Sequence, residues 1–105
     1  MGKARPITIK TRSFAKAGDA SAFFSAMLAR YPIGAQVSPI DQDDLLALLD
    51  RHDERDEKIG LGIVSFTVER APPPYEGQRC FWIIRNDLSR VDFSYQHCLK
   101  PKPYD

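Results

Sequence analysis

The stretch KIGLGIVSFTVERAPPPYEGQRCFWIIRNDLSRVDFSYQHCL, residues 58–99, decides the fold because it contains three extended apolar runs. Residues 62–69 alternate in character, which is the period-2 pattern of a strand with one buried face. The face expected to be buried carries Gly62, Val64, Phe66 and Val68. Residues 79–86 are apolar on both sides, so this strand should be central, and residues 91–95 alternate again. A Pro-rich loop and a short Asn-Asp turn join the three runs, which predicts an antiparallel meander.

Two amphipathic helices are expected before this sheet. The first should run from about Ala20 to Tyr31, with Asp19 as its N-cap and Pro32 ending it. The second should begin near Asp41, or alternatively at Ser38-Pro39, with the polar residues 51–58 as its solvated end. Short strands are expected at residues 35–37 and 7–12. The predicted core residues are Phe24, Leu28, Leu49, Phe66 and Ile83.

Size and composition indicate one domain over residues 1–105, of the α+β class. A chain of 105 residues can bury a core without metal or disulfide support, and 43% apolar with 28% charged residues is typical of globular proteins. No apolar run approaches the roughly 18 residues of a membrane span, and the N-terminus lacks the apolar stretch of a secretory signal. We therefore expect a cytoplasmic protein without a membrane partner.

The thiols and histidines give little support to metal or catalytic chemistry. Cys80 and Cys98 are expected to be reduced thiols, and His97 beside Cys98 on a strand would point to the opposite face, so no metal and no cofactor is predicted. The weak catalytic candidates are His52, Asp92 and His97. His52 is more simply a helix-end residue, and Asp92 should turn inward and pair with Arg79 or Arg85.

Charge is segregated although the net charge is only +1. Residues 41–57 hold eight acidic residues against Arg51 and Arg55, whereas the first seventeen residues carry basic side chains and no acidic one. The predicted nucleic-acid-binding residues are the N-terminal cations Arg5, Lys10, Arg12 and Lys16. On a strand over residues 7–12, Ile7 and Ile9 would face inward and Thr8, Lys10 and Arg12 would share the solvent side, where they could contact a phosphate backbone. The alternative interpretation is a pair of solvated faces of opposite charge.

Several short motifs resemble a known family. The motif KIGxGI begins at Lys58, RCF at Arg79 and DFSY at Asp92, and a late Cys98 follows. Over about residues 14–99 the chain resembles the domain of the DCL (defective chloroplasts and leaves) family. The resemblance implies a curved antiparallel sheet of three to five strands with two helices packed on one face, similar to an α/β roll. Residues 86–89 depart from the Asp-Gly turn of the family, so a four- or five-residue connection is expected there.

The resemblance also implies a link to RNA, because plant members are associated with chloroplast ribosomal RNA processing and the domain occurs in a plant RNA polymerase large subunit. Three functions follow. The first is a non-enzymatic accessory domain that binds RNA or a ribonucleoprotein. The second is a protein-interaction module that uses the proline loop, the acidic segment or a sheet edge. The third is an RNA-processing enzyme using His52, Asp92 and His97.

Overall fold

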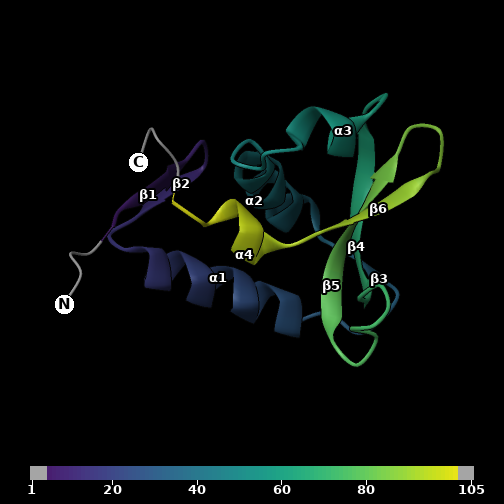
Figure 1. The fold of residues 1–105 in the computed structure, drawn as a ribbon, viewed down its shortest axis with the longest axis horizontal. Helices are drawn as coiled ribbons and strands as arrows, with labels where there is room; N and C mark the ends of the chain where they lie inside the picture. Colours follow the sequence, from purple (N-terminus) through teal and green to yellow (C-terminus); the bar gives the residue numbers. More distant parts are fainter. Residues whose placement is uncertain (1–4, 102–105) are drawn as a thin grey trace.

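A four-stranded antiparallel sheet stands beside a layer of helices in the computed structural model, which describes residues 5–101 (Figure 1). The strand order is β3-β4-β5-β6. These strands are β3 (Ala35–Gln36), β4 (Ile63–Arg70), β5 (Arg79–Arg85) and β6 (Arg90–Phe93). The helices are α1 (Ala17–Ala29), α2 (Pro39–Leu49), α3 (Arg55–Ile59) and α4 (Tyr95–Cys98). The predicted α+β class and antiparallel meander are confirmed, with β5 in the interior of the sheet.

The predicted phase of β4 is right in its second half and wrong in its first. Phe66 and Val68 are fully buried, but Val64 is 51% exposed and Ser65 is buried. The pairing with β5 shifts between Ile63 and Ser65, and a β-bulge of this kind turns the preceding residues to the other face. Val64 therefore points to solvent, contrary to the strict alternation of the sequence.

The end of the chain leaves the sheet earlier than predicted. β6 stops at Phe93, and Ser94 caps α4 by accepting a hydrogen bond from the His97 backbone N–H. In the motif DFSY, Asp92 and Phe93 therefore end β6, while Ser94 and Tyr95 begin α4. His97 and Cys98 lie on a helix, so the prediction that placed them on opposite faces of a strand is wrong.

Both long helices begin at a different residue from the first choice of the sequence analysis. Lys16, and not Asp19, is the N-cap residue of α1, and Asp19 lies in its first turn. Helix α2 begins at Pro39 with Ser38 as N-cap, which confirms the alternative start. It ends at Leu49, and residues 55–59 form the separate helix α3, so the polar run is not the end of one long helix.

The N-terminal residues form a hairpin and not a single strand. β1 (Ile7–Ile9) pairs with β2 (Arg12–Phe14), and Lys10-Thr11 are the turn between them. Ile7 and Ile9 are buried as predicted. Thr8, Lys10 and Arg12 do not share one face of one strand, because the chain reverses between them.

One hydrophobic core joins the hairpin, the helices and the inner face of the sheet. Of the predicted core residues, Phe24, Leu49, Phe66 and Ile83 are fully buried, and Leu28 is half-buried against them. Within residues 5–101, none of the helices has the length and apolar character needed to cross a membrane.

Candidate functional site

The outer face of the sheet, which points away from α1 and α2, carries the only tryptophan of the chain. Residues along β5 alternate, so Phe81 and Ile83 are buried against the helices while Trp82 lies on the other side and is half-buried. Thr67 on β4 and Asp92 on β6 are the direct cross-strand neighbours of Trp82. Trp82 is thus flanked on both sides by polar side chains on an outward-facing surface.

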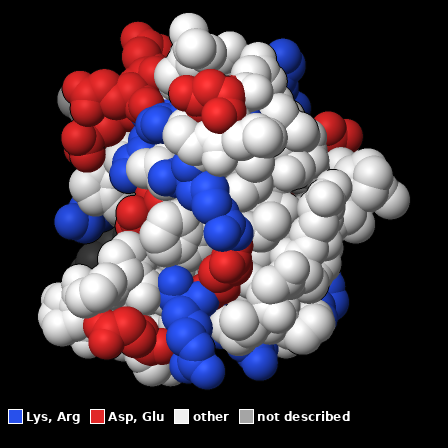
Figure 2. Space-filling model, turned by 90° about the vertical axis from the view of Figure 1, so that its right-hand side faces the viewer, with Lys and Arg blue, Asp and Glu red and all other residues white. Residues whose placement is uncertain are grey.

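A shallow hollow of about 240 Å³ surrounds this tryptophan and is lined by Ile33, Glu69, Arg70, Trp82 and Arg90. The indole N–H of Trp82 donates a hydrogen bond to the carbonyl oxygen of Arg70 at 3.1 Å, which fixes the orientation of the ring. Arg90 forms an ion pair with Glu69. Figure 2, which views the molecule from the sheet side, shows basic side chains down the middle with acidic ones between them, and more acidic side chains at the upper left.

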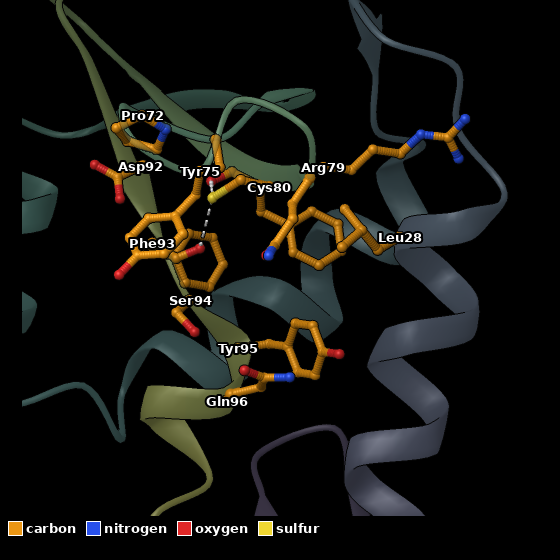
Figure 3. A pocket seen from close by; sticks show the side chains of 13 residues that line it. Leu28, Pro72, Tyr75, Arg79, Cys80, Asp92, Phe93, Ser94, Tyr95 and Gln96 are labelled. Atoms are coloured by element: carbon orange, nitrogen blue, oxygen red, sulfur yellow. Dashed lines mark hydrogen bonds between the residues drawn. The ribbon is translucent and has the colours of Figure 1, made fainter.

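A larger cleft of about 430 Å³ lies where β5, β6, α4 and the loop of residues 71–78 meet (Figure 3). The side chains that line it include Pro72, Tyr75, Cys80, Asp92 and Tyr95. Burial is the main cause that raises the pKa of the Cys80 thiol to about 11, and the nearby Asp92 carboxylate adds to it. The thiol is therefore protonated at neutral pH, and the cleft holds no thiolate nucleophile.

Asp92 lines the cleft and lies opposite Trp82 on the outer face of the sheet, so its predicted inward orientation and its predicted arginine partner are both wrong. Arg85 donates instead to the carbonyl oxygens of Lys58 and Glu57, and Arg79 donates to that of Ala29. No hydrogen bond or ion pair within residues 5–101 involves the Asp92 carboxylate. Its backbone carbonyl accepts a hydrogen bond from the Lys58 ammonium at 2.9 Å, so Lys58 covers part of the free edge of β6.

The two histidines, 45 residues apart in the sequence, lie next to each other, but neither of them lines the cleft that contains Asp92. The ring centroids of His52 and His97 are 4.6 Å apart, and His97 Nε2 lies 3.3 Å from an Asp53 carboxylate oxygen. His52 is buried, and its Nδ1 accepts a hydrogen bond from the Glu54 backbone N–H at 2.9 Å. Burial lowers the pKa of His52, and the nearby His97 and Lys58 lower it further.

This pair holds α4 against the end of α2 and lines neither the hollow nor the cleft. Arg51 strengthens the same junction, because its Nε donates to the carbonyl oxygen of Cys98 at 2.8 Å. No three His, Cys, Asp or Glu side chains of residues 5–101 gather as a metal-binding group. Cys80 and Cys98 are not joined in a disulfide.

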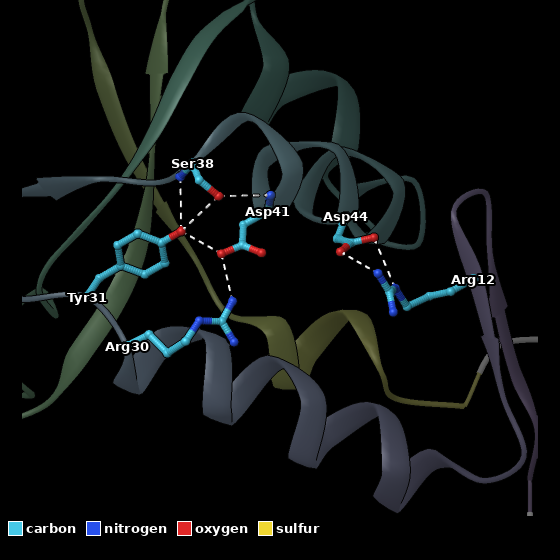
Figure 4. Close-up of polar contacts among 6 residues, drawn as sticks. All are labelled: Arg12, Arg30, Tyr31, Ser38, Asp41 and Asp44. Carbon is cyan, nitrogen blue, oxygen red and sulfur yellow. Dashed lines mark hydrogen bonds and ion pairs between the residues drawn. The ribbon is translucent and has the colours of Figure 1, made fainter.

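The predicted basic strip is only partly available to a ligand. Arg12 forms a two-point ion pair with Asp44, which is 3% exposed (Figure 4). The Arg12 guanidinium also lies over the Phe23 ring, 4.3 Å from its centroid. Arg5 donates to the carbonyl oxygen of Leu99 at 2.8 Å. Lys10 and Lys16 are exposed, on the hairpin turn and before α1. A nucleic-acid-binding role for these four residues stays a prediction.

Figure 4 also explains the second buried carboxylate of α2. The Tyr31 hydroxyl donates to Asp41 at 2.5 Å and accepts from the Ser38 backbone N–H at 3.0 Å, while Arg30 pairs with the same carboxylate at 2.7 Å. Burial would raise the pKa of Asp41, but the hydrogen bonds from Tyr31 and Arg30 outweigh it and lower the pKa. These contacts fix the end of α1 to the start of α2 and are structural.

Sequence reasoning missed the hollow. Residues 79–86, apolar on both sides, predict a strand that is buried on both faces, and Arg70 and Arg90 are not among the predicted binding residues. The signal was present in the alternation of RCFWIIR, since Phe81 and Ile83 on one face place Trp82 on the other. The neighbours of Trp82 on β4 and β6 required the strand register, which a single sequence does not contain.

Comparison with known proteins places the chain in a family. Residues 25–99 match the family described as protein of unknown function DUF3223. The chain is 44% identical over 72 residues to "Protein DCL, chloroplastic" of Solanum lycopersicum, which covers 68% of this chain and 32% of that protein. It is 31% identical over 70 residues to "DNA-directed RNA polymerase V subunit 1" of Arabidopsis thaliana, which covers 66% of this chain and 4% of that subunit. The chain thus spans about a third or less of these two relatives.

A solved structure has the same fold. The solution NMR structure of an uncharacterized protein from Rhodospirillum rubrum matches with a TM-score of 0.81 and 44% identity, and the match covers 93% of this chain and 91% of that one. The α+β fold is therefore shared with a small protein of similar length. Together these matches confirm the resemblance in the motifs from Lys58 to Cys98: the chain belongs to the DUF3223 family and carries the domain of the DCL proteins.

Proposed function

We propose that this chain is a non-enzymatic accessory domain that binds an unpaired RNA strand on the outer face of its sheet. The observation that carries the proposal is the hollow that Trp82 lines together with the exposed residues Arg70 and Arg90. Single-stranded nucleic acids are bound by aromatic rings, on which bases stack, together with cations that contact the phosphates. Both kinds of group occur here within one surface depression.

The indole ring is held before any ligand arrives. Its hydrogen bond to the Arg70 carbonyl oxygen restricts the side chain, so less conformational entropy is lost when a base stacks on it. Base stacking on an aromatic side chain contributes about 1–3 kcal/mol per base. A single platform with two arginines therefore supports weak, salt-sensitive binding with little sequence preference of its own.

The mixed charge of this face favours a small number of phosphate contacts over a broad polyanion-binding surface (Figure 2). Arg90 already pairs with Glu69, so a phosphate has to compete with that carboxylate. The match to part of an RNA polymerase subunit supports an RNA context for the domain. A link to ribosomal RNA processing and a cytoplasmic location remain predictions from the resemblance and the sequence.

The chain offers its own reporter for the test, because Trp82 is the only tryptophan. We would titrate an oligouridine strand of about eight nucleotides at low salt and follow the intrinsic tryptophan fluorescence. Quenching that saturates is expected, since a stacked base changes the environment of the indole. With a fluorescent label on the RNA, Trp82→Ala should weaken binding by roughly 5- to 150-fold, which corresponds to about 1–3 kcal/mol. Trp82→Phe should recover part of the affinity.

Two arginine variants separate a local contact from general charge. Arg70→Gln removes a cation that lines the hollow, whereas Arg55→Gln removes one on α3 that lies outside it and pairs with Asp50. Only Arg70→Gln should weaken binding. Equal losses for the two variants, or unchanged affinity in Trp82→Ala, would exclude the hollow as the binding surface.

A protein-interaction module is the second candidate, and one observation favours it. Leu61 and Leu88 are 78% and 75% exposed at the same end of the sheet, because the Asn86 amide donates to the Leu61 carbonyl oxygen at 2.9 Å. Addition of a strand at β6 is disfavoured, since Lys58 occupies part of that edge. If RNA binding is absent at low salt, a pull-down that is lost in the Leu61→Ser, Leu88→Ser double variant would support this function.

A further inference from the structure

An ion pair between β4 and β6 crosses the strand that carries Trp82. Glu69 on β4 is the cross-strand neighbour of Cys80. Arg90 on β6 is the cross-strand neighbour of Ile84. On β5, Trp82 is midway between Cys80 and Ile84 and shares the outer face with them, since alternate strand residues point the same way. The Glu69 and Arg90 side chains therefore meet by reaching across β5 from opposite sides of Trp82.

The Glu69 carboxylate has a second partner beside Arg90. Its Oε2 atom accepts a hydrogen bond from the Thr67 hydroxyl at 3.0 Å and also pairs with the Arg90 guanidinium. The Glu69 side chain is 27% exposed, whereas that of Arg90 is 49% exposed. Thr67 lies on β4 directly opposite Trp82. A ligand that takes Arg90 from Glu69 therefore leaves the carboxylate in the hollow, because the Thr67 hydroxyl still holds it there.

A ligand that offers only phosphates gains little from this arrangement. Phosphate and carboxylate are both anions that pair with a guanidinium, so the exchange of one for the other at Arg90 has a small net effect. The carboxylate that stays in the hollow then repels the bound phosphate. A strand with unpaired bases has a further contribution, since stacking of one base on Trp82 increases affinity by roughly 5- to 150-fold. Only a ligand that supplies both groups displaces the ion pair with a net gain.

We propose that Glu69 is a specificity-determining residue of the hollow, which makes it bind strands with unpaired bases and reject polyanions that offer phosphates alone. The rejected class includes inorganic polyphosphate and duplex RNA, whose paired bases are not free to stack. Specific binding surfaces commonly contain such a repulsive element against the wrong ligand. This inference rests on the proposed RNA-binding function and adds to it which polyanions are excluded.

The test measures how strongly polyphosphate and oligouridine compete for the same surface. A labelled oligouridine strand of about eight nucleotides is bound at low salt, and unlabelled oligouridine or inorganic polyphosphate of similar length is added while the anisotropy is followed. For the wild type, polyphosphate should be much the weaker competitor. Glu69→Gln keeps the shape of the side chain but removes its charge, so the ratio of the two inhibition constants should narrow by roughly fivefold, the scale of one exposed ion pair. Duplex RNA should gain as a competitor in the same way.

Two further variants separate this local effect from a general change of charge. Glu76→Gln removes an exposed acidic residue from the loop of residues 71–78, outside the residues that line the hollow. It should strengthen both competitors equally and leave their ratio at the wild-type value. Thr67→Val removes the hydroxyl that holds Glu69 in place and should narrow the ratio by less than Glu69→Gln does. A ratio that narrows equally in Glu76→Gln and Glu69→Gln would overturn the proposal.

Failure of this inference can be told from failure of the proposed function. If the wild type binds oligouridine and the ratio is unchanged in Glu69→Gln, Glu69 does not set the specificity and RNA binding stands. If neither protein binds oligouridine, the proposed function is wrong, and polyphosphate alone then tests Glu69 by amide NMR. Shifts around Trp82 and Arg90 in Glu69→Gln but not in the wild type would support the exclusion of phosphate by Glu69, and equal or absent shifts would overturn it.

Discussion

Phe66 and Val64 are two residues apart on β4 but differ completely in burial, since Phe66 is fully buried and Val64 is 51% exposed. Truncation of Phe66 to Ala should lower the free energy of unfolding by about 3–5 kcal/mol, because a large ring is removed from the core. Val64→Ala is the matched control on the same strand and should cost less than about 1 kcal/mol. Urea denaturation measures both. Comparable losses in the two variants would mean that the β-bulge between Ile63 and Ser65 is misplaced.

Arg12 and Lys10 lie in the same hairpin but have different surroundings. Arg12→Gln should lower the free energy of unfolding by roughly 1–2 kcal/mol, because the nearly buried Asp44 carboxylate loses its charged partner. This loss of stability is small for an ion pair with a buried carboxylate, because the Arg12 side chain is 40% exposed and water screens its charge. Lys10→Gln, which removes an exposed charge from the turn, should change stability by less than about 0.5 kcal/mol. Thermal or urea unfolding that ranks the two variants equally would contradict the structural role of Arg12.

At the scale of the element, the docking of α4 should depend on pH through His52. Burial lowers the pKa of His52 below its ordinary value of about 6.5, and the nearby His97 and Lys58 lower it further. The folded state then binds fewer protons than the unfolded state, so the stabilisation is complete above about pH 6.5 and is lost as the pH falls through the lowered pKa. The free energy of unfolding should therefore decrease between about pH 7.5 and 5.5.

His52→Asn tests this pH dependence while keeping an acceptor for the Glu54 N–H. The variant should show a flatter pH dependence over the same window in urea denaturation. Asp41 does not interfere, because its lowered pKa affects stability only below about pH 4. An unchanged slope in His52→Asn would assign the acid sensitivity to another group.

The strands and the two long helices could be predicted from periodicity and turn residues, but their ends could not. Ser94 continues the alternating pattern of β6 in the sequence. Its hydroxyl nevertheless caps α4 by accepting a hydrogen bond from the His97 backbone N–H, so the strand ends before Ser94. Arg51 and His52 look like the polar end of a helix, but they are buried because α4 packs on them from 45 or more residues away in the sequence. Such contacts between distant segments leave no local signal.

At the scale of the whole molecule, the candidate site depends on which distant residues meet. The sequence indicates that Arg12 is a cation on a strand. It does not show that Asp44, on helix α2, forms an ion pair with this cation. The sequence predicts Trp82 only as part of a central apolar strand and Asp92 only as the partner of an arginine. Their common position on the outer face follows only from the β5–β6 register. The chemistry of each residue was therefore predictable, and its neighbours were not.

The salt dependence of RNA binding should reflect the small number of cations at the hollow. With a net charge of +1 and two arginines that line the hollow, the logarithm of the affinity should fall against the logarithm of the salt concentration with a slope of about −1 to −2. Arg70→Gln should reduce this slope by about 0.7, and Lys10→Gln should leave it unchanged. If the slope changes only in Lys10→Gln, the N-terminal cations and not the hollow contact the RNA phosphates.

The most direct test of RNA binding on the outer sheet face is an amide NMR titration of the whole chain with an oligouridine strand at low salt. The predicted result is a shift of the Trp82 indole N–H and of amides around it on β4, β5 and β6, with the hairpin of residues 7–14 unaffected. Shifts confined to that hairpin, or no shifts anywhere, would contradict this account.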